Sequence, residues 1–352
     1  MIRAQLRKVK DAVENNLDKA ATKTGLTLNR NEPLKQINNG KVPQVEARAG
    51  GEIIATSKPK TQRAVLEDIE FKCTELASDI YKYLVNHEKK YTVDPDFMNG
   101  GEPTNKMRRI LIDWLLQVHL RFHLLPETLH LAVFLLDHML SKKMIKKTDL
   151  QLLGVSCMFV ASKFEEVFLP DVYDYEYITE NAFNKKQILQ MEQLILNTIQ
   201  YDLSCPSSLV FARSISRLLL EGEDCGKFDE APFVTAYNMS KYLGELALLD
   251  ATMSSVPKSH IAMAAMSISL KLCPVMGLDI NKAEEKIMLH MDANRSDLEE
   301  TTVLLAQAAL KMFKQDKLFA VKQKYQSPKM GQIANYVTNE TRLKLEKMSE
   351  VL

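Results

Sequence analysis

From about residue 70 onward, apolar side chains recur at intervals of three and four residues, and a strand-like alternation is almost absent. This spacing is typical of amphipathic helices, so we expect an all-α protein. The clearest case is residues 106–122, where Arg108, Asp113 and Gln117 fall largely away from an apolar stripe. The stripe consists of Met107, Ile110, Leu111, Trp114, Leu115 and Val118. One face of this helix must be buried.

Two further helices, predicted at residues 128–140 and 150–164, are apolar nearly all round and should be surrounded by other helices. Thr148 with Asp149 supplies an N-cap for the second. Asn184 can cap the next helix, with Gln187 completing a capping box. That helix ends before a break at residues 204–206.

After the break the helical pattern begins again, which suggests a repeat. We place helices near residues 207–220, 232–249, 258–273, 281–290 and 296–313. A shift of about 108 residues superimposes Gly154, Cys157, Met158, Ala161 and Lys163 on Ala262, Ala265, Met266, Ser269 and Lys271. Small side chains let neighbouring helices approach closely, so each half is predicted to surround one such helix. The alternative is that any two buried helices share this composition.

Composition restricts the class of protein. The 352 residues are 46% hydrophobic and 26% charged, which is ordinary for a soluble globular protein. A net charge of +1 gives no reason to expect binding to nucleic acid or a membrane surface. Residues 1–62 carry twelve Lys/Arg and six Asp/Glu, an excess of +6, and are predicted to form a disordered basic tail. The longest apolar stretch, residues 129–136, is too short to span a membrane, and no secretory leader is expected.

Nothing in the sequence indicates a catalytic or metal site. The five cysteines include no C-x-x-C pair, which favours reduced thiols over a disulfide framework or zinc site. His119 and His123 have the spacing of two zinc ligands but lack the glutamate of the metalloprotease pattern. No phosphate-binding loop or nucleophile signature is present. We therefore expect no cofactor, no metal and no intrinsic catalysis.

Three gap-free blocks resemble the cyclins. They are MRRILIDWL at 107–115, LQLLG at 150–154 continuing to ASKFEE at 161–166, and YITE at 177–180 continuing to NKKQILQME at 184–192. Segments at 78–84 and 241–250 extend the resemblance over roughly residues 70–325. FARSISR at 211–217 is more similar to B-type (G2/mitotic) than to A-type cyclins.

The resemblance implies two tandem five-helix cyclin boxes preceded by an N-terminal helix. The expected divisions are a tail at 1–69, a first box with that helix at 70–203, a second box at 204–325 and a C-terminal extension at 326–352. It also implies a non-catalytic subunit that activates a cyclin-dependent protein kinase at the G2/M transition, in the cytoplasm and nucleus. The alternatives are a cyclin-fold transcription factor, an A-type cyclin acting in S phase, or a helical scaffold that binds no kinase.

By resemblance, Lys163 and Glu192 hold the kinase, because an ammonium and a carboxylate can bind open main-chain groups at a helix end. The alternative is an internal ion pair between the two, and both interpretations can hold together. Phe164, Glu165 and Glu166 are expected on the same surface. The expected contacts from the N-terminal helix are Asp79, Ile80 and Tyr83. For that helix the alternative is simple packing onto the first box.

The resemblance also implies a shallow groove that docks Arg-x-Leu segments of substrates or inhibitors. Its expected residues are Met107, Ile110, Trp114, Gln117, Leu150 and Gln151. We expect Trp114 to be partly exposed; burial in the core is the alternative. The family usually has alanine where this chain has Arg109.

The tail is expected to carry an Arg-x-x-Leu destruction signal that a ubiquitin ligase recognises at mitotic exit. Two candidates occur, Arg3 with Leu6 and Arg63 with Leu66, and the sequence does not decide between them. Ser327-Pro328 could be a phosphorylation site for a proline-directed kinase or simply a helix-terminating loop.

Overall fold

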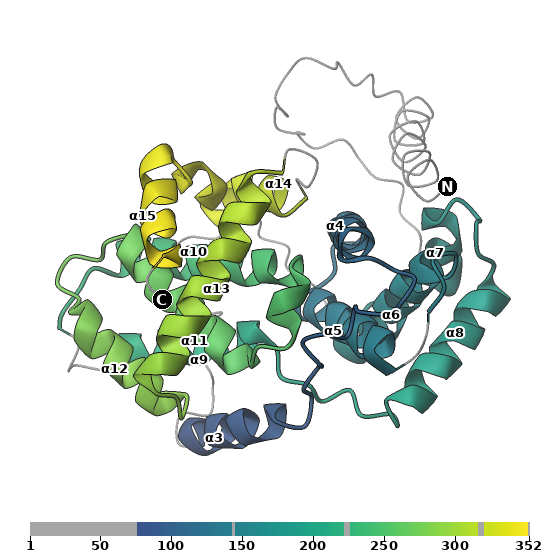
Figure 1. Ribbon diagram of the computed structural model, residues 1–352, viewed down its shortest axis with the longest axis horizontal. Coiled ribbons are helices and arrows are strands. Elements are labelled where there is room, and N and C mark those ends of the chain that lie inside the picture. The colour runs from purple at the N-terminus through teal and green to yellow at the C-terminus, as the bar shows by residue number, and fades with distance from the viewer. Residues whose placement is uncertain (1–75, 143–144, 222–225, 316–319, 351–352) are drawn as a thin grey trace, which may run out of the picture. The chain divides into compact units, whose positions relative to one another are not determined.

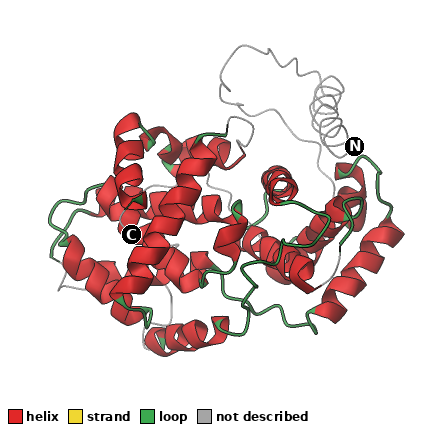
Figure 2. Ribbon diagram, viewed as in Figure 1, coloured by secondary structure: helices red, strands yellow, loops and turns green. Residues whose placement is uncertain are grey.

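The computed structural model describes residues 76–142, 145–221, 226–315 and 320–350. Within these ranges the chain consists of helices and connecting loops, with no β-strand (Figure 2). The predicted all-α class is confirmed. The predicted basic tail and the Arg-x-x-Leu candidates Arg3, Leu6, Arg63 and Leu66 lie outside the described residues.

Ten of the described helices form two bundles of five (Figure 1). The first comprises α4 (Asn105–Arg121), α5 (Pro126–Lys142), α6 (Leu150–Glu165), α7 (Val172–Ile178) and α8 (Lys185–Thr198). The second comprises α9 (Ser208–Glu221), α10 (Glu230–Leu248), α11 (Lys258–Leu272), α12 (Ile280–His290) and α13 (Arg295–Phe313), with the short 3₁₀ turn η2 (Ala251–Ser254). This is the expected tandem arrangement.

Helix α3 (Ala77–Glu88) precedes the bundles, and a short series of elements follows them. These are α14 (Ala320–Gln326), η3 (Pro328–Met330), η4 (Ile333–Tyr336) and α15 (Asn339–Ser349). The sequence pattern did not indicate α14 or α15. Only Leu345 of α15 is buried, so its polar sequence carries no clear apolar stripe.

Helix caps test the local predictions directly. Asn184 accepts a hydrogen bond from the Gln187 N–H, and the Gln187 side chain accepts one from the Asn184 N–H, so the predicted capping box is confirmed. The N-cap position predicted for α6 is correct, but the side-chain capping bond is absent. Asp149 occupies the N-cap position but makes no capping bond, and its carboxylate accepts from the Thr148 hydroxyl at 3.0 Å instead.

The two helices that carry the repeat, α6 and α11, are buried over nearly their whole length. A Cβ on Gly154 would lie 2.9 Å from the methyl groups of Leu111, so α4 and α6 approach as closely as the small residue allows. Helix α11 packs in the same way against α9, α10 and α13. Each bundle therefore surrounds one small-residue helix, as the repeat predicted.

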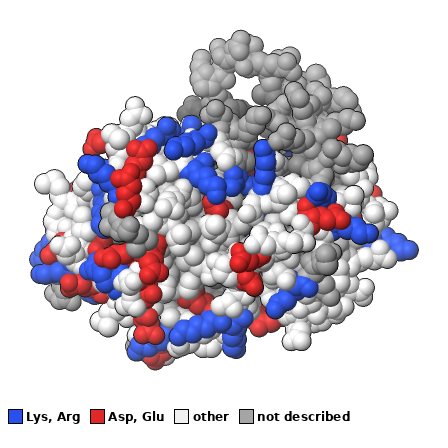
Figure 3. Space-filling view, viewed as in Figure 1, with Lys and Arg blue, Asp and Glu red and all other residues white. Residues whose placement is uncertain are grey.

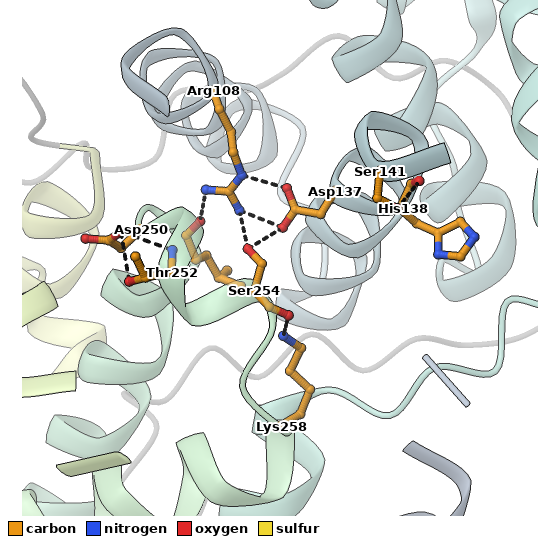
Figure 4. A network of polar contacts seen from close by, with 9 residues as sticks. Arg108, Asp137, His138, Ser141, Asp250, Thr252, Ser254 and Lys258 are labelled. Carbon is orange, nitrogen blue, oxygen red and sulfur yellow. Dashed lines mark hydrogen bonds and ion pairs between the residues drawn. The ribbon is translucent and has the colours of Figure 1, made fainter. Parts of the chain in front are cut away.

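Helix α4 is buried on more sides than its pattern indicated. Arg108 and Asp113, which the pattern placed away from the core, expose 1% and 4% of their surface. Arg108 forms an ion pair with Asp137 of α5, at 2.6 Å, and also donates to the Ser254 hydroxyl of the second bundle (Figure 4). Asp113 accepts from the Ala320 N–H of α14 at 3.1 Å. The periodicity of one helix cannot show that a later bundle and α14 cover its polar side.

Helix α3 is anchored on the second bundle. The Tyr81 ring lies edge-on to His290 of α12, with centroids 5.6 Å apart. At its other end, Glu88 accepts from the N–H and hydroxyl of Ser259, in the first turn of α11. Simple packing of α3 onto the first box, the alternative considered from the sequence, does not describe these contacts.

The described surface carries both signs of charge, and Lys/Arg and Asp/Glu side chains are interspersed over the face in view (Figure 3). Cys157, Cys205 and Cys273 are free thiols. No described helix has the length and apolar character needed to cross a membrane. No group of three or more His, Cys, Asp or Glu side chains in the described ranges is placed to hold a metal ion.

Candidate functional site

Lys163 and Glu192 join the end of α6 to the middle of α8. The Lys163 ammonium lies 2.7 Å from Glu192 Oε1 and 4.2 Å from the centre of the Phe159 ring. The Lys163 side chain remains 42% exposed and that of Glu192 13%. The internal ion pair therefore forms. Both side chains remain partly open to solvent, so each can still make further hydrogen bonds.

An unusual number of large apolar side chains are exposed beside this pair, at the end of α6, in the loop that follows and on α7. We call them the α6–α7 surface: Phe164, Val167, Phe168, Leu169, Tyr173 and Tyr177. Phe168 is 92% exposed and Val167 83%. Large exposed apolar side chains next to charged groups are typical of surfaces that bind another protein.

Sequence reasoning found only Phe164 of this surface. The signal for the rest was the apolar run Val167, Phe168 and Leu169 ahead of Pro170, in a segment without helical spacing. Apolar residues outside a helix with a regular apolar stripe are not directed into the core by helical periodicity. Tyr173 and Tyr177 lie on α7, which is too short for a convincing stripe.

The two carboxylates after Lys163 have different roles. Glu166 accepts from the Leu125 N–H at 2.6 Å and from the Thr128 hydroxyl, so it ties the end of α6 to the start of α5. Glu165 is half-buried, and its pKa is raised by desolvation and then by the nearby carboxylates of Glu127 and Glu166. A cation from a partner would relieve this repulsion.

Two of the three predicted α3 residues, Asp79 and Tyr83, are exposed. Asp79 is exposed, Ile80 is half-buried, and Tyr83 is 59% exposed with its ring stacked 5.0 Å from that of His87. Among the described residues, no hydrogen bond or ion pair connects them to Lys163 or Glu192.

The residues of the predicted docking groove are more buried than expected. Met107, Ile110, Gln117 and Gln151 are half-buried, and Leu150 is buried. Trp114 exposes only 7% of its surface, so the expectation of partial exposure is wrong. The reason is that α4 packs against α6 on one side and α14 on another.

Polar groups beside the groove are already engaged or buried. The Gln117 amide donates to Asp113 at 3.2 Å. Arg109, the departure from the family pattern, is 9% exposed, and its Nε has no hydrogen-bond partner in the described part of the chain. Its charge therefore lies mostly beneath the surface.

Comparison with known proteins covers most of the chain. The family described as cyclin, N-terminal domain matches residues 79–204, and cyclin, C-terminal domain matches residues 206–339. The chain is 53% identical over 346 residues to G2/mitotic-specific cyclin-B1 of Caenorhabditis elegans, covering 96% of this chain and 94% of that protein.

More distant relatives match a smaller share of the chain. G2/mitotic-specific cyclin-B of Spisula solidissima is 39% identical over 261 residues, which cover 74% of this chain and 57% of that protein. The X-ray structure of a viral cyclin from herpesvirus saimiri aligns with a TM-score of 0.48 and 18% identity, covering 63% of this chain and 97% of the viral chain. The two domain matches and the identity to B-type relatives lead to one conclusion: this chain belongs to the cyclin family, among the B-type cyclins.

Proposed function

We propose that this chain is the regulatory subunit of a cyclin-dependent protein kinase and activates it by holding a kinase element on the first bundle. The observation that carries the proposal is the α6–α7 surface beside the Lys163–Glu192 pair. Apolar side chains supply area that is buried on binding, and the pair supplies donors and an acceptor for main-chain groups.

Activation needs no catalytic group from this chain. In protein kinases, a glutamate on the C helix must pair with the β3 lysine before ATP is correctly held. A subunit that binds the helix-in state more tightly than the helix-out state shifts the equilibrium by its differential affinity alone. A rigid face suits this role, and the interhelical contacts of Lys163 and Glu166 hold the end of α6 in place.

The finer parts of the proposal rest on the B-type family. We place the activity at G2/M, in the cytoplasm and nucleus, with destruction by a ubiquitin ligase through Arg3 and Leu6 or Arg63 and Leu66. We propose the groove around Met107 and Ile110 as the dock for Arg-x-Leu segments. Met107 and Ile110 are half-buried, so part of each side chain is open to solvent there.

The deciding experiment mixes the purified full chain with a monomeric cyclin-dependent kinase and measures histone phosphorylation. We expect the kinase to become active in proportion to the complex formed. A Phe168→Asp variant, altered at a side chain that makes almost no internal contact, should fold normally and activate poorly. A kinase that stays idle with the wild-type chain would refute the proposal.

A further inference from the structure

Ser327-Pro328 is the only Ser-Pro or Thr-Pro dipeptide in the sequence. Of the twelve prolines, one follows a serine and none follows a threonine. A protein kinase that requires proline directly after the acceptor hydroxyl can therefore modify this chain at one position only. The sequence left two interpretations of the dipeptide, a phosphorylation site or a helix-terminating loop, and the structure shows what the serine does in the unmodified chain.

The Ser327 hydroxyl closes the C-terminal end of α14. Its Oγ donates to the Lys324 carbonyl oxygen at 2.7 Å, and the Ser327 N–H donates to the same oxygen at 3.3 Å. The last carbonyl groups of a helix have no partner within the helix, so the hydroxyl satisfies one of them. Helix α14 has only seven residues and therefore few other backbone hydrogen bonds to hold it.

The segment after the serine lies on the surface. Pro328 and Lys329 are exposed, and Ser327 is half-buried. Ser327 has a φ of −67° and a ψ of 147°, the extended backbone that proline imposes on the residue before it. Hydrogen bonds from the Met330 N–H to the Ser327 carbonyl and from the Gly331 N–H to the Pro328 carbonyl close the following turn, η3. This turn contains no buried residue, so it can open to a kinase without exposing the core.

The buried contacts of α14 connect the two bundles. The Ala320 N–H donates to Asp113 of α4 at 3.1 Å. The Lys324 ammonium lies 2.5 Å from the Glu245 carboxylate of α10, and these side chains expose only 5% and 3%. The Tyr325 hydroxyl donates to the same carboxylate at 2.9 Å. Two of these three links come from the last turn of α14, the turn that the Ser327 hydroxyl closes.

A phosphate on Ser327 would remove the donor that closes this turn. The modified Oγ carries no hydrogen, and the group brings a charge of about −1.5 to −2 at neutral pH. That charge lies at the negative end of the helix dipole, where an anion is destabilising. The exposed Lys322 and Lys329 can reduce the repulsion in the open turn as well as in the helix, so they do not oppose opening. The last turn of α14 should therefore separate, and Lys324 with it.

We propose that Ser327 is a phosphorylation site for a proline-directed protein kinase, and that phosphate there detaches α14 from the two bundles that it connects. The Ser327 Oγ attacks the γ-phosphorus of ATP, and a new O–P bond forms. The bond from that phosphorus to the bridging oxygen breaks, ADP leaves, and the hydroxyl proton passes to the catalytic-loop aspartate of the kinase. The site does not depend on whether this chain itself activates a kinase.

The first part of the test incubates the full chain with Mg-ATP and a purified proline-directed kinase that needs no partner subunit. Mass spectrometry should find one phosphate, on Ser327, and none on a Ser327→Ala variant. Pro328→Ala should slow incorporation at least about tenfold, because the kinase selects the proline. A synthetic peptide of residues 322–333 shows whether the kinase accepts the sequence outside the fold.

Ser349 provides the matched control. Its Oγ donates to the Glu346 carbonyl oxygen at 2.7 Å, so it closes the end of α15 as Ser327 closes that of α14, and it is also half-buried. It is followed by Glu350 and not by proline. Ser349→Ala should therefore leave phosphate incorporation unchanged.

The second part measures amide hydrogen exchange in residues 320–326. Exchange in the phosphorylated chain should be at least about tenfold faster, equivalent to ~1.4 kcal/mol of opening free energy. Ser327→Asp should change exchange in the same direction, whereas Ser349→Asp should leave α14 unchanged. Exchange in the interior of α13, residues 298–312, should stay at the unmodified rate, which shows that the fold is intact.

Two results would overturn the proposal. One is a full chain that takes no phosphate on Ser327, whether or not the peptide is modified. The other is a phosphorylated chain in which α14 exchanges at the unmodified rate. Histone phosphorylation by the complex with a cyclin-dependent kinase is a separate measurement, so failure of the proposed function is distinguishable from failure here.

Discussion

The Lys163 ammonium lies 2.7 Å from the Glu192 carboxylate, so the two side chains expected to hold the kinase also hold each other. An exposed ion pair adds little to stability because water already solvates both charges. Its value is to fix both groups in one orientation before a partner arrives, which lowers the entropic cost of binding. The internal pair is therefore compatible with the proposed binding site.

We predict that Lys163→Ala or Glu192→Ala weakens kinase binding by roughly 2–5 kcal/mol, as expected when a buried interfacial charge loses its partner. The melting temperature should change little. Titration of the kinase with each variant measures the affinity. Lys344→Ala is the matched control, since Lys344 also forms an exposed pair, with Glu340, and its side chain is 40% exposed. An affinity equal to that of the wild type would argue against the assigned contact.

Phe168→Ala should separate binding from stability. The side chain is 92% exposed, so its loss should alter the free energy of unfolding by less than about 0.5 kcal/mol. If Phe168 is buried by the kinase, the affinity should fall by roughly 2 kcal/mol or more, as for an aromatic anchor at the centre of an interface. Calorimetric titration and thermal unfolding of the same preparation give both quantities. Equal kinase affinity for the variant and the wild type would remove Phe168 from the interface.

Arg108 and Asp137 make a contrasting, buried pair. Arg108 is 1% exposed and Asp137 4%, and Arg108 also donates to Ser254 of the second bundle. Removing one partner leaves an uncompensated buried charge, so Arg108→Met should cost roughly 3–5 kcal/mol of stability. Arg108→Met with Asp137→Leu should recover much of this loss, because it removes both charges. Chemical denaturation of the two variants is the measurement, and a double variant no more stable than the single one would contradict the argument.

The sequence alone predicted the elements with strong local signals. Residues 150–164 and 258–273 were expected to be central, and the Asn184 capping box was expected in detail, because apolar periodicity and capping chemistry depend on neighbouring residues. Both are confirmed. Arg108 and Asp113 were misplaced because their partners are remote: Asp137 and Ser254 for one, Ala320 for the other.

The candidate site was only partly predictable for a related reason. Lys163 and Glu192 were found by resemblance. They are in contact although they lie 29 residues apart in the sequence. Val167 and Phe168 were missed because exposure is a property of the folded surface. Trp114 shows the reverse error, since a residue expected at the surface is buried by the packing of α4.

Deletion of residues 1–66 tests the proposed destruction signals, which both lie in that segment. The truncated chain should persist at mitotic exit, when the full chain disappears, and should still activate the kinase. Double substitutions Arg3→Ala with Leu6→Ala, and Arg63→Ala with Leu66→Ala, then show which element acts. Immunoblotting through a synchronised mitosis is the measurement. Normal disappearance of the truncated chain would count against both elements.

Acid should destabilise the protein before its carboxylates titrate. Burial lowers the pKa of His119 and of His130 from 6.5 to about 4, so both are neutral in the folded state. The unfolded chain binds protons at these positions below pH 6.5, and stability is therefore lost as pH falls from 6.5 towards 4. Each histidine accounts for roughly 3 kcal/mol at most, at 1.36 kcal/mol per pKa unit.

The denaturation midpoint measured between about pH 7 and pH 5 reports on the buried histidines, since the unperturbed pKa values of Asp and Glu lie near 4. Burial also lowers the pKa of His138 and of His290, which add to the same slope. His130→Gln should flatten the slope in that window, because glutamine binds no proton in either state. His123→Gln is the control for the histidine-to-glutamine change itself, because His123 is exposed. If the midpoint of the wild-type chain does not fall between these pH values, the two buried histidines are not neutral in the folded protein.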